Sequence, residues 1–344
     1  MNLILPGIIS LLITAFTIPL TIIFAKRFNL LDNPKIRYHP AHTQKRVVPR
    51  AGGLPVFIAI AVSMLVFIPF SSHTTGILGG LFILLVVGLL DDRYQNLSPY
   101  LRLVAQLAAA ALAVGSGISI AFITNPLGGI IQFGEIGNFL AVIWIVWVMN
   151  MINWSKGVDG QMPGIITIAA LVLGLLSLKL SQDPSQLNFA KLSFITAGSA
   201  LGLLIFNWHP AKIFPGFSGS GVLGFMVAIL AILSGAKLAT AGLVLLIPAT
   251  DFAYTFWRRI LSGKSPVWGD RGHLHHKLLK IGLSHQQIAL FYILGSVILG
   301  GVSLNLSSSG KLFAAILVGI IILGGILWLN FFGDYSKQHA PDNG

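Results

Sequence analysis

The chain has 344 residues, of which 55% are apolar and only 9% carry a formal charge, with a mean hydropathy of +0.85. This composition excludes an ordinary soluble domain and predicts several membrane-spanning helices, and the absence of cysteine excludes disulfides and thiolate metal sites. The net charge of +12 is typical of positively charged loops at a membrane and of attraction towards anionic headgroups or substrates, so no nucleic acid is expected as a partner.

The apolar runs predict an all-α fold, a polytopic helical bundle forming a single membrane domain over residues 1–344. We expect about eleven transmembrane helices, followed by a polar tail over residues 333–344. The first run has neither a basic stretch before it nor a small-residue cleavage site, so it is interpreted as a retained helix. The spans are expected at residues 4–24, 54–70, 76–90, 101–122, 137–152, 162–180, 193–207, 219–234, 238–256, 287–305 and 312–331.

Lysine and arginine are distributed unevenly between the two sides of this expected bundle. With the N-terminus outside, all of them lie in inner connectors or the tail except Lys179, Lys191, Lys237 and Lys311. This bias predicts an outer N-terminus and a cytoplasmic C-terminus, with the basic inner connectors on the cytoplasmic side. On the outer side, residues 125–138 predict a small hairpin.

The first inner connector, residues 26–53, is rich in basic residues and ends in Pro49-Arg50-Ala51-Gly52-Gly53. Arginine and lysine here could hold phosphate groups, and the glycines allow a close approach of the backbone to a ligand or a neighbouring helix. The alternative is simple topological anchoring.

Two adjacent carboxylates, Asp91 and Asp92, end the third apolar run, and Arg102 lies just inside the next one. Ionised groups at the mouth of a span are costly to bury and usually mark a site, so the two acids are candidate catalytic residues. Arg102 could meet a phosphate at the membrane surface. The alternative is a hydrated connector with ordinary surface acids.

The third inner connector places Asn150 and Asn153 one turn apart at a helix end, followed by Asp159-Gly160. Carboxamides and a carboxylate suit a hard cation or sugar hydroxyls. A helix C-terminus with a glycine turn explains the same pattern equally well.

The fourth inner connector contains Asn207 and ends in Gly216-Phe217-Ser218-Gly219-Ser220, which leads into a span. Backbone amides at such a helix start could hold phosphate, although an ordinary capped helix start gives the same sequence.

The fifth inner connector gathers His273, His275 and His276 near Asp270 and Arg271. A histidine cluster could bind a metal, but imidazole and guanidinium groups also bind phosphate and nucleotides, which we prefer here. The alternative is a solvated basic loop that only anchors the topology.

In their order and spacing, these segments resemble the polyprenyl-phosphate N-acetylhexosamine-1-phosphate transferases of glycosyltransferase family 4. That family includes the undecaprenyl-phosphate N-acetylglucosaminyl 1-phosphate transferases and, more distantly, the phospho-N-acetylmuramoyl-pentapeptide transferase. The resemblance extends from about Asp32 to His285. It rests on PRAGG, GLLDD with LSPYLRLVAQ, the segment Asn150–Gly160, FNWHPAKIF with its Gly-Ser run, and GDRGHLHHKLLKIGLSH.

The resemblance implies transfer of a sugar-1-phosphate, with N-acetylglucosamine as the expected sugar, from a UDP-sugar to undecaprenyl phosphate at the cytoplasmic face. Mg²⁺ is the expected cofactor, and cell-wall or surface polysaccharide synthesis the expected process. The expected partners are the two substrates and the lipid bilayer, while a homodimer is left open.

By the same resemblance, Asp91 and Asp92 would position or deprotonate the lipid phosphate. Asn153 would contribute to the metal site. His273, His275 and His276 would bind diphosphate or uridine. The other expected substrate-binding residues are Arg50, Arg102, Asn150, Asp159, Asn207 and Arg271.

Two positions depart from the family pattern. Lys156 stands at the first acid of Asn-x-x-Asp-Gly-x-Asp-Gly, and Phe217 stands where Met-Gly-Asp-x-Gly-Ser has its metal-binding acid. A phenyl ring offers no oxygen to Mg²⁺, and the exchange makes the pocket more positive.

Two hypotheses therefore remain: an active transferase with altered metal use, or a degenerate, non-catalytic relative that binds polyprenyl phosphate or nucleotide-sugar. A transporter is less favoured because the polar residues gather at one face, with Asp251 as the exception.

Overall fold

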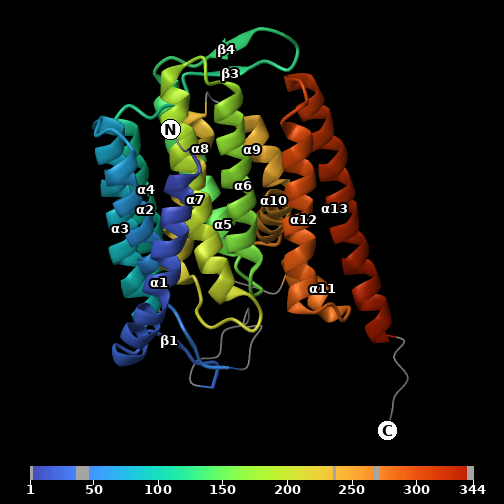
Figure 1. The fold of residues 1–344 in the computed structure, drawn as a ribbon. Coiled ribbons are helices and arrows are strands. Elements are labelled where there is room, and N and C mark those ends of the chain that lie inside the picture. The colour runs from blue at the N-terminus through green and yellow to red at the C-terminus, as the bar shows by residue number, and fades with distance from the viewer. Residues whose placement is uncertain (1–2, 36–45, 96, 235–237, 266–271, 339–344) are drawn as a thin grey trace.

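The computed structural model describes residues 3–35, 46–95, 97–234, 238–265 and 272–338 (Figure 1). Long apolar helices stand side by side in a bundle, with a short two-stranded sheet at each of its two ends. The described helices are α1 (Leu5–Arg27), α2 (Gly53–Phe67), α3 (Ser72–Tyr94), α4 (Pro99–Gly115), α5 (Ile136–Trp154), α6 (Gln161–Lys179), α7 (Pro184–Asn207), α8 (Gly216–Leu233), α9 (Leu238–Val244), α10 (Leu246–Leu261), α11 (Leu274–Lys280), α12 (His285–Ser303) and α13 (Ser308–Gln338).

Eight of the described helices are long and apolar enough to cross a membrane. The pair α9 and α10 makes a ninth if it is counted as one span, and α2 and α4 are shorter apolar helices. The all-helical, polytopic class is therefore confirmed, while the number of eleven spans and their orientation stay predictions.

The span expected over residues 238–256 is not one continuous helix. The chain breaks at Leu245, and α10 leaves α9 at an angle of 83°. Pro248 lies in the first turn of α10, where its missing N–H and its ring are tolerated, but neither suits the interior of a continuous helix.

Two other helix ends differ from expectation. α7 begins at Pro184 rather than near residue 193, because the Asp183 side chain caps it by accepting a hydrogen bond from Ser185 N at 2.9 Å. α4 ends at Gly115 rather than residue 122, just before Gly117, whose φ of 102° cannot continue a helix.

The predicted hairpin is present between α4 and α5 and is shifted towards the N-terminus. Strand β3 (Phe122–Thr124) pairs antiparallel with β4 (Ile130–Gln132). At the other end of the bundle, β1 (Leu31–Asp32) pairs with β2 (Val48–Pro49), and Phe214 N donates to Pro49 O. The first inner connector is thus joined to the segment that leads into α8.

Helix α8 is the centre of the bundle, and every one of its residues from Gly216 to Leu233 is buried. Its first turn packs directly on the backbones of α2 and α3, where a Cβ on Gly53 or Gly88 would overlap Ser218. Because glycine permits this close approach, the C-terminal end of α3 lies against the N-terminal end of α8. Figure 1 shows α11 at the same end of the bundle, opposite the β3–β4 hairpin.

Candidate functional site

Asp92 lies in the last turn of α3, fully buried, and its carboxylate closes the N-terminus of α8. Oδ1 accepts a hydrogen bond from Phe217 N at 2.8 Å, and Oδ2 accepts from Ser218 N at 3.3 Å and from the Ser218 hydroxyl. Arg50 Nε lies 3.5 Å from Oδ1. A carboxylate is stabilised at a helix N-terminus. Both Asp92 oxygens, which were expected to contact a ligand, therefore accept hydrogen bonds from the first turn of α8 instead.

Asp91 points to different partners, although it is the adjacent residue. Its Oδ1 lies 2.8 Å from Arg102 Nη2, which also donates to Leu97 O at 3.1 Å. The Arg102 guanidinium lies over the Phe217 ring, 5.6 Å from its centroid. Arg102 therefore joins Asp91 to the phenyl ring that replaces the expected acid.

Lys156 lies in the connector between α5 and α6, and its Nζ donates to Gly216 O at 3.2 Å. Burial and then the neighbouring Arg50 charge lower the pKa of Lys156 to about 7, although Asp92 and Asp91 oppose this shift. The site thus brings the side chains of Arg50, Arg102 and Lys156 around the two acids.

Asn153 belongs to this group, and Asn150 does not. The Asn153 Oδ1 atom accepts a hydrogen bond from the Ser220 hydroxyl at 2.9 Å, so Asn153 lies beside the first turn of α8. Asn150 Nδ2 instead donates to Gln106 Oε1 at 2.9 Å and to Val146 O. Asn150 therefore joins α5 to α4.

Asp159 and Asn207 hold the third inner connector to the fourth. Asn207 Oδ1 accepts from Gly160 N at 3.0 Å, while its Nδ2 donates to Ile213 O. Asp159 Oδ2 accepts from Ala211 N at 3.1 Å and lies 2.7 Å from His209 Nδ1. These hydrogen bonds shape the loops around the acids.

The histidine segment is placed by Asp251, a residue of α10. Its Oδ2 lies 3.1 Å from His273 Nδ1, and its Oδ1 accepts from Leu274 N at 2.8 Å, at the start of α11. Asp251, the one acid inside an apolar run, thus has its partners at the start of α11. His276 is buried beside His275, with ring centroids 4.3 Å apart.

His275 joins the histidine segment to the Lys156 connector. Its Nε2 packs so closely on Gly157 that a Cβ there would overlap it. Burial, and then the charges of His276 and His273, lower the pKa of His275 well below its usual value, so the ring is neutral near pH 7. Its Nδ1 is buried and has no hydrogen-bond partner among the described residues. Arg271, expected beside it, lies outside those residues.

Comparison with known proteins finds a family model and relatives that match the chain. The model of glycosyl transferase family 4 matches residues 74–235. A probable undecaprenyl-phosphate N-acetylglucosaminyl 1-phosphate transferase of Bacillus subtilis is 33% identical over 300 residues, which cover 84% of this chain and 81% of that protein. The chain belongs to glycosyl transferase family 4.

Other relatives of this family 4 protein are similar over most of their length. The decaprenyl-phosphate N-acetylglucosaminephosphotransferase of Mycolicibacterium smegmatis is 30% identical over 362 residues, covering 94% of this chain and 86% of that protein. An undecaprenyl-phosphate alpha-N-acetylglucosaminyl 1-phosphate transferase of Pasteurella multocida is 28% identical, covering 97% and 94%. The resemblance inferred from the motifs is confirmed.

The residues of this family 4 protein do not fit the Mg²⁺ ion that its motifs lead one to expect. Phe217 is only 1% exposed and offers no oxygen where an acid is expected. The Asp92 carboxylate accepts hydrogen bonds from the start of α8, and Asp91 forms an ion pair with Arg102. Asn153 Oδ1 accepts a hydrogen bond from the Ser220 hydroxyl. Mg²⁺ requires near-octahedral oxygen coordination, which this set does not supply.

Another group could hold a metal on the basis of its residue types. One potential ligand atom from each of Asp159, His209 and His285 lies within 4.8 Å of the others. However, the two rings are stacked with centroids 4.7 Å apart, and Asp159 Oδ2 already accepts from Ala211 N. Sequence reasoning missed this group, because His209 and His285 are far apart in the chain.

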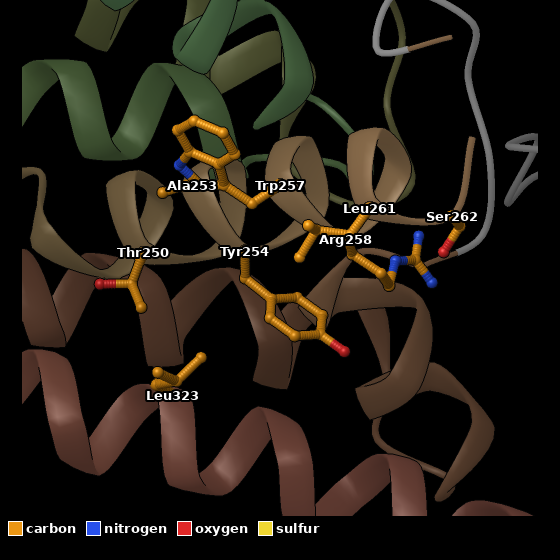
Figure 2. A pocket seen from close by; sticks show the side chains of 8 residues that line it. All are labelled: Thr250, Ala253, Tyr254, Trp257, Arg258, Leu261, Ser262 and Leu323. Atoms are coloured by element: carbon orange, nitrogen blue, oxygen red, sulfur yellow. The ribbon is translucent and has the colours of Figure 1, made fainter. Parts of the chain in front are cut away.

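The family 4 protein also has an apolar groove of about 490 Å³ between α10 and α13 (Figure 2). Tyr254 lies in the middle of the groove, and its hydroxyl accepts from Asn330 Nδ2 at 2.6 Å. Arg258, at one end, packs against Gly272, the residue before His273. Lys277 Nζ lies 4.8 Å from the Tyr254 ring centroid, so the groove adjoins α11.

Proposed function

We propose that this family 4 protein transfers a sugar-1-phosphate from a UDP-sugar to a polyprenyl phosphate. The observation that supports this most strongly is the set of contacts that links Asp91, Arg102, Lys156 and His275 from four separate segments around the start of α8. The named relatives act on undecaprenyl or decaprenyl phosphate and N-acetylglucosamine. We therefore propose undecaprenyl phosphate and UDP-N-acetylglucosamine as the substrates.

In this reaction an oxygen of the lipid phosphate attacks the phosphorus that carries the sugar. A new phosphorus–oxygen bond forms, the bond to the bridging oxygen breaks, and UMP leaves. Most of the catalysis in such transfers is positioning and offset of negative charge, which Arg50, Arg102 and Lys156 would supply. Asp91, the acid not used by α8, would orient the lipid phosphate through Arg102 or accept its proton.

The groove between α10 and α13 suits the isoprenoid chain of the acceptor. Its lining residues Trp257 and Leu261 are 57% and 84% exposed, as expected for side chains that face lipid. We place the site at the cytoplasmic face of a bacterial-type inner membrane, because the basic connectors lie at that end of the bundle. Cell-wall or surface polysaccharide synthesis is the proposed process.

A second candidate function is favoured by Phe217 alone. With a phenyl ring at the position of the expected metal-binding acid, the protein would bind polyprenyl phosphate or nucleotide-sugar without turnover. The remaining charged groups, and His275 Nδ1, which lacks a hydrogen-bond partner within the described ranges, would then serve binding only.

A transfer assay separates the two functions. Purified protein is incubated with undecaprenyl phosphate and UDP-N-acetylglucosamine labelled in the sugar, with Mg²⁺ or with EDTA. The proposed function predicts lipid-linked label and an equal amount of UMP, both lost in Asp91→Asn. Binding of the UDP-sugar without either product would favour the second function, and the absence of both product and binding would refute both.

A further inference from the structure

We propose that Arg50, Arg102 and Lys156 form a built-in cationic site that binds the phosphate groups of the substrates without a divalent metal. The inference rests on the proposed function and concerns how the same site handles negative charge. Its ligand class is the phosphate group, presented either by a nucleoside diphosphate or by a lipid phosphate.

The charges of the site are already balanced by side chains. Arg50 lies 3.7 Å from Asp32 and 3.5 Å from Asp92, and Arg102 lies 2.8 Å from Asp91. With Lys156 included, three basic side chains face three acids. If carboxylates stood at positions 156 and 217, five acids would face two arginines, and the site would need a cation before it could accept an anionic substrate.

Lys156 is the group most available to a ligand. In the described part of the chain it makes no ion pair, and its Nζ donates a hydrogen bond to the carbonyl of Gly216. Burial and then the neighbouring Arg50 charge disfavour its protonated form, which lowers the pKa of Lys156 to about 7. A bound phosphate would favour the protonated form of Lys156, because it would place an acceptor and further negative charge beside the amine.

The arginines also keep hydrogen-bonding capacity. Arg102 Nε is buried and has no hydrogen-bond partner among the described residues, and the same holds for Arg50 Nε, which makes only the longer ion pair with Asp92. Buried N–H groups without acceptors are unfavourable, so a ligand oxygen there would be stabilising.

Phe217 also helps to position a cation of the site. Its buried ring lies under the Arg102 guanidinium at 5.6 Å, a cation–π contact that holds the side chain beside Asp91. The residue that removes a metal ligand therefore positions one of the cations that replace the metal.

The test measures binding by calorimetry with the full chain in lipid nanodiscs, in EDTA and in Mg²⁺. One arm uses UDP as the probe, and a second arm adds undecaprenyl phosphate to the nanodiscs and measures its retention by native mass spectrometry. The variants are Lys156→Met, Lys156→Arg and the double variant Lys156→Asp with Phe217→Asp. Lys191→Met, near the far end of α7 from Asn207, is the matched control.

We expect the parent to bind UDP equally well in EDTA and in Mg²⁺. Lys156→Met should weaken binding at least tenfold, whereas Lys156→Arg and Lys191→Met should stay within about threefold of the parent. The double variant should bind UDP only with Mg²⁺. The lipid arm shows whether the same cations also hold the acceptor phosphate, through a parallel loss in Lys156→Met.

Parent binding that requires Mg²⁺ would overturn the inference while leaving the proposed function intact. Equal binding by the parent and Lys156→Met in both arms would also overturn it. If the parent binds neither probe under any condition, the proposed function fails, and the inference fails with it.

Discussion

The adjacent acids Asp91 and Asp92 should differ sharply in their contribution to stability. Asp92 accepts hydrogen bonds from two backbone amides and a hydroxyl at the start of α8 and lies 3.5 Å from Arg50. Asp91 has one ion pair, to Arg102, whose side chain is 29% exposed. The structure therefore assigns anchoring of α8 to Asp92 and leaves Asp91 for a ligand.

The magnitudes follow from these partners. Asp92→Ala leaves buried amides without an acceptor and Arg50 without one of its acids, a loss of about 3–5 kcal/mol in unfolding free energy. In Asp91→Ala, Arg102 keeps its bond to Leu97 O and its access to solvent, so the loss should be about 1 kcal/mol.

The assay is thermal unfolding of the purified variants in one detergent, followed by intrinsic tryptophan fluorescence. Asp92→Ala should lower the melting temperature several times more than Asp91→Ala, while both should abolish transfer. Each variant serves as the control for the other because the two acids are adjacent and are both almost fully buried. Equal shifts, or a larger shift for Asp91→Ala, would refute the assignment of Asp92 to α8.

Three further predictions concern the connector that follows α5. The double variant Lys156→Asp with Phe217→Asp should raise Mg²⁺-dependent transfer well beyond either single change, because the two positions share one site. Robust Mg²⁺-dependent transfer by the parent that does not improve in the double variant would contradict this prediction. The affinity for UDP-sugar should fall as the pH rises from about 7 to 9 in calorimetry, because the pKa of Lys156 is about 7 and only its protonated form attracts phosphate. In Lys156→Arg this fall should disappear, and a parent profile that is flat over the same range would count against the charge of Lys156. Gly157→Ala should weaken UDP binding strongly, because the added Cβ would displace His275. The control variant Gly115→Ala should bind UDP normally, because there is open space around that position. Equal binding by the two variants would show that the contact between Gly157 and His275 is not needed.

Much of the fold could be predicted from the sequence, because apolar runs of sufficient length have few alternatives to a membrane helix. The break at Leu245 could not, since α9 and α10 form a single apolar run whose bend depends on packing around Pro248. The described parts of the inner connectors lie together at one end of the bundle, as expected when successive helices alternate in direction.

The different partners of Asp91 and Asp92 could not be predicted from the sequence. Successive residues of a helix point about 100° apart, so only the position of α8 decides which acid meets its amides. The pairing of Asp251 with His273 was missed for a similar reason: the bend between α9 and α10 brings α10 beside the histidine segment. Its only sequence signal was an acid without an obvious partner in an apolar run.

The central claim is that side-chain cations, rather than a metal, hold the phosphates. A structure of the protein crystallised with UDP-N-acetylglucosamine and Mn²⁺, with data collected at the manganese absorption edge, tests it most directly. The account predicts diphosphate oxygens within about 3 Å of Lys156 Nζ and of the Arg102 guanidinium, with no anomalous peak in the site. An anomalous peak between the diphosphate and Asp91 would contradict it.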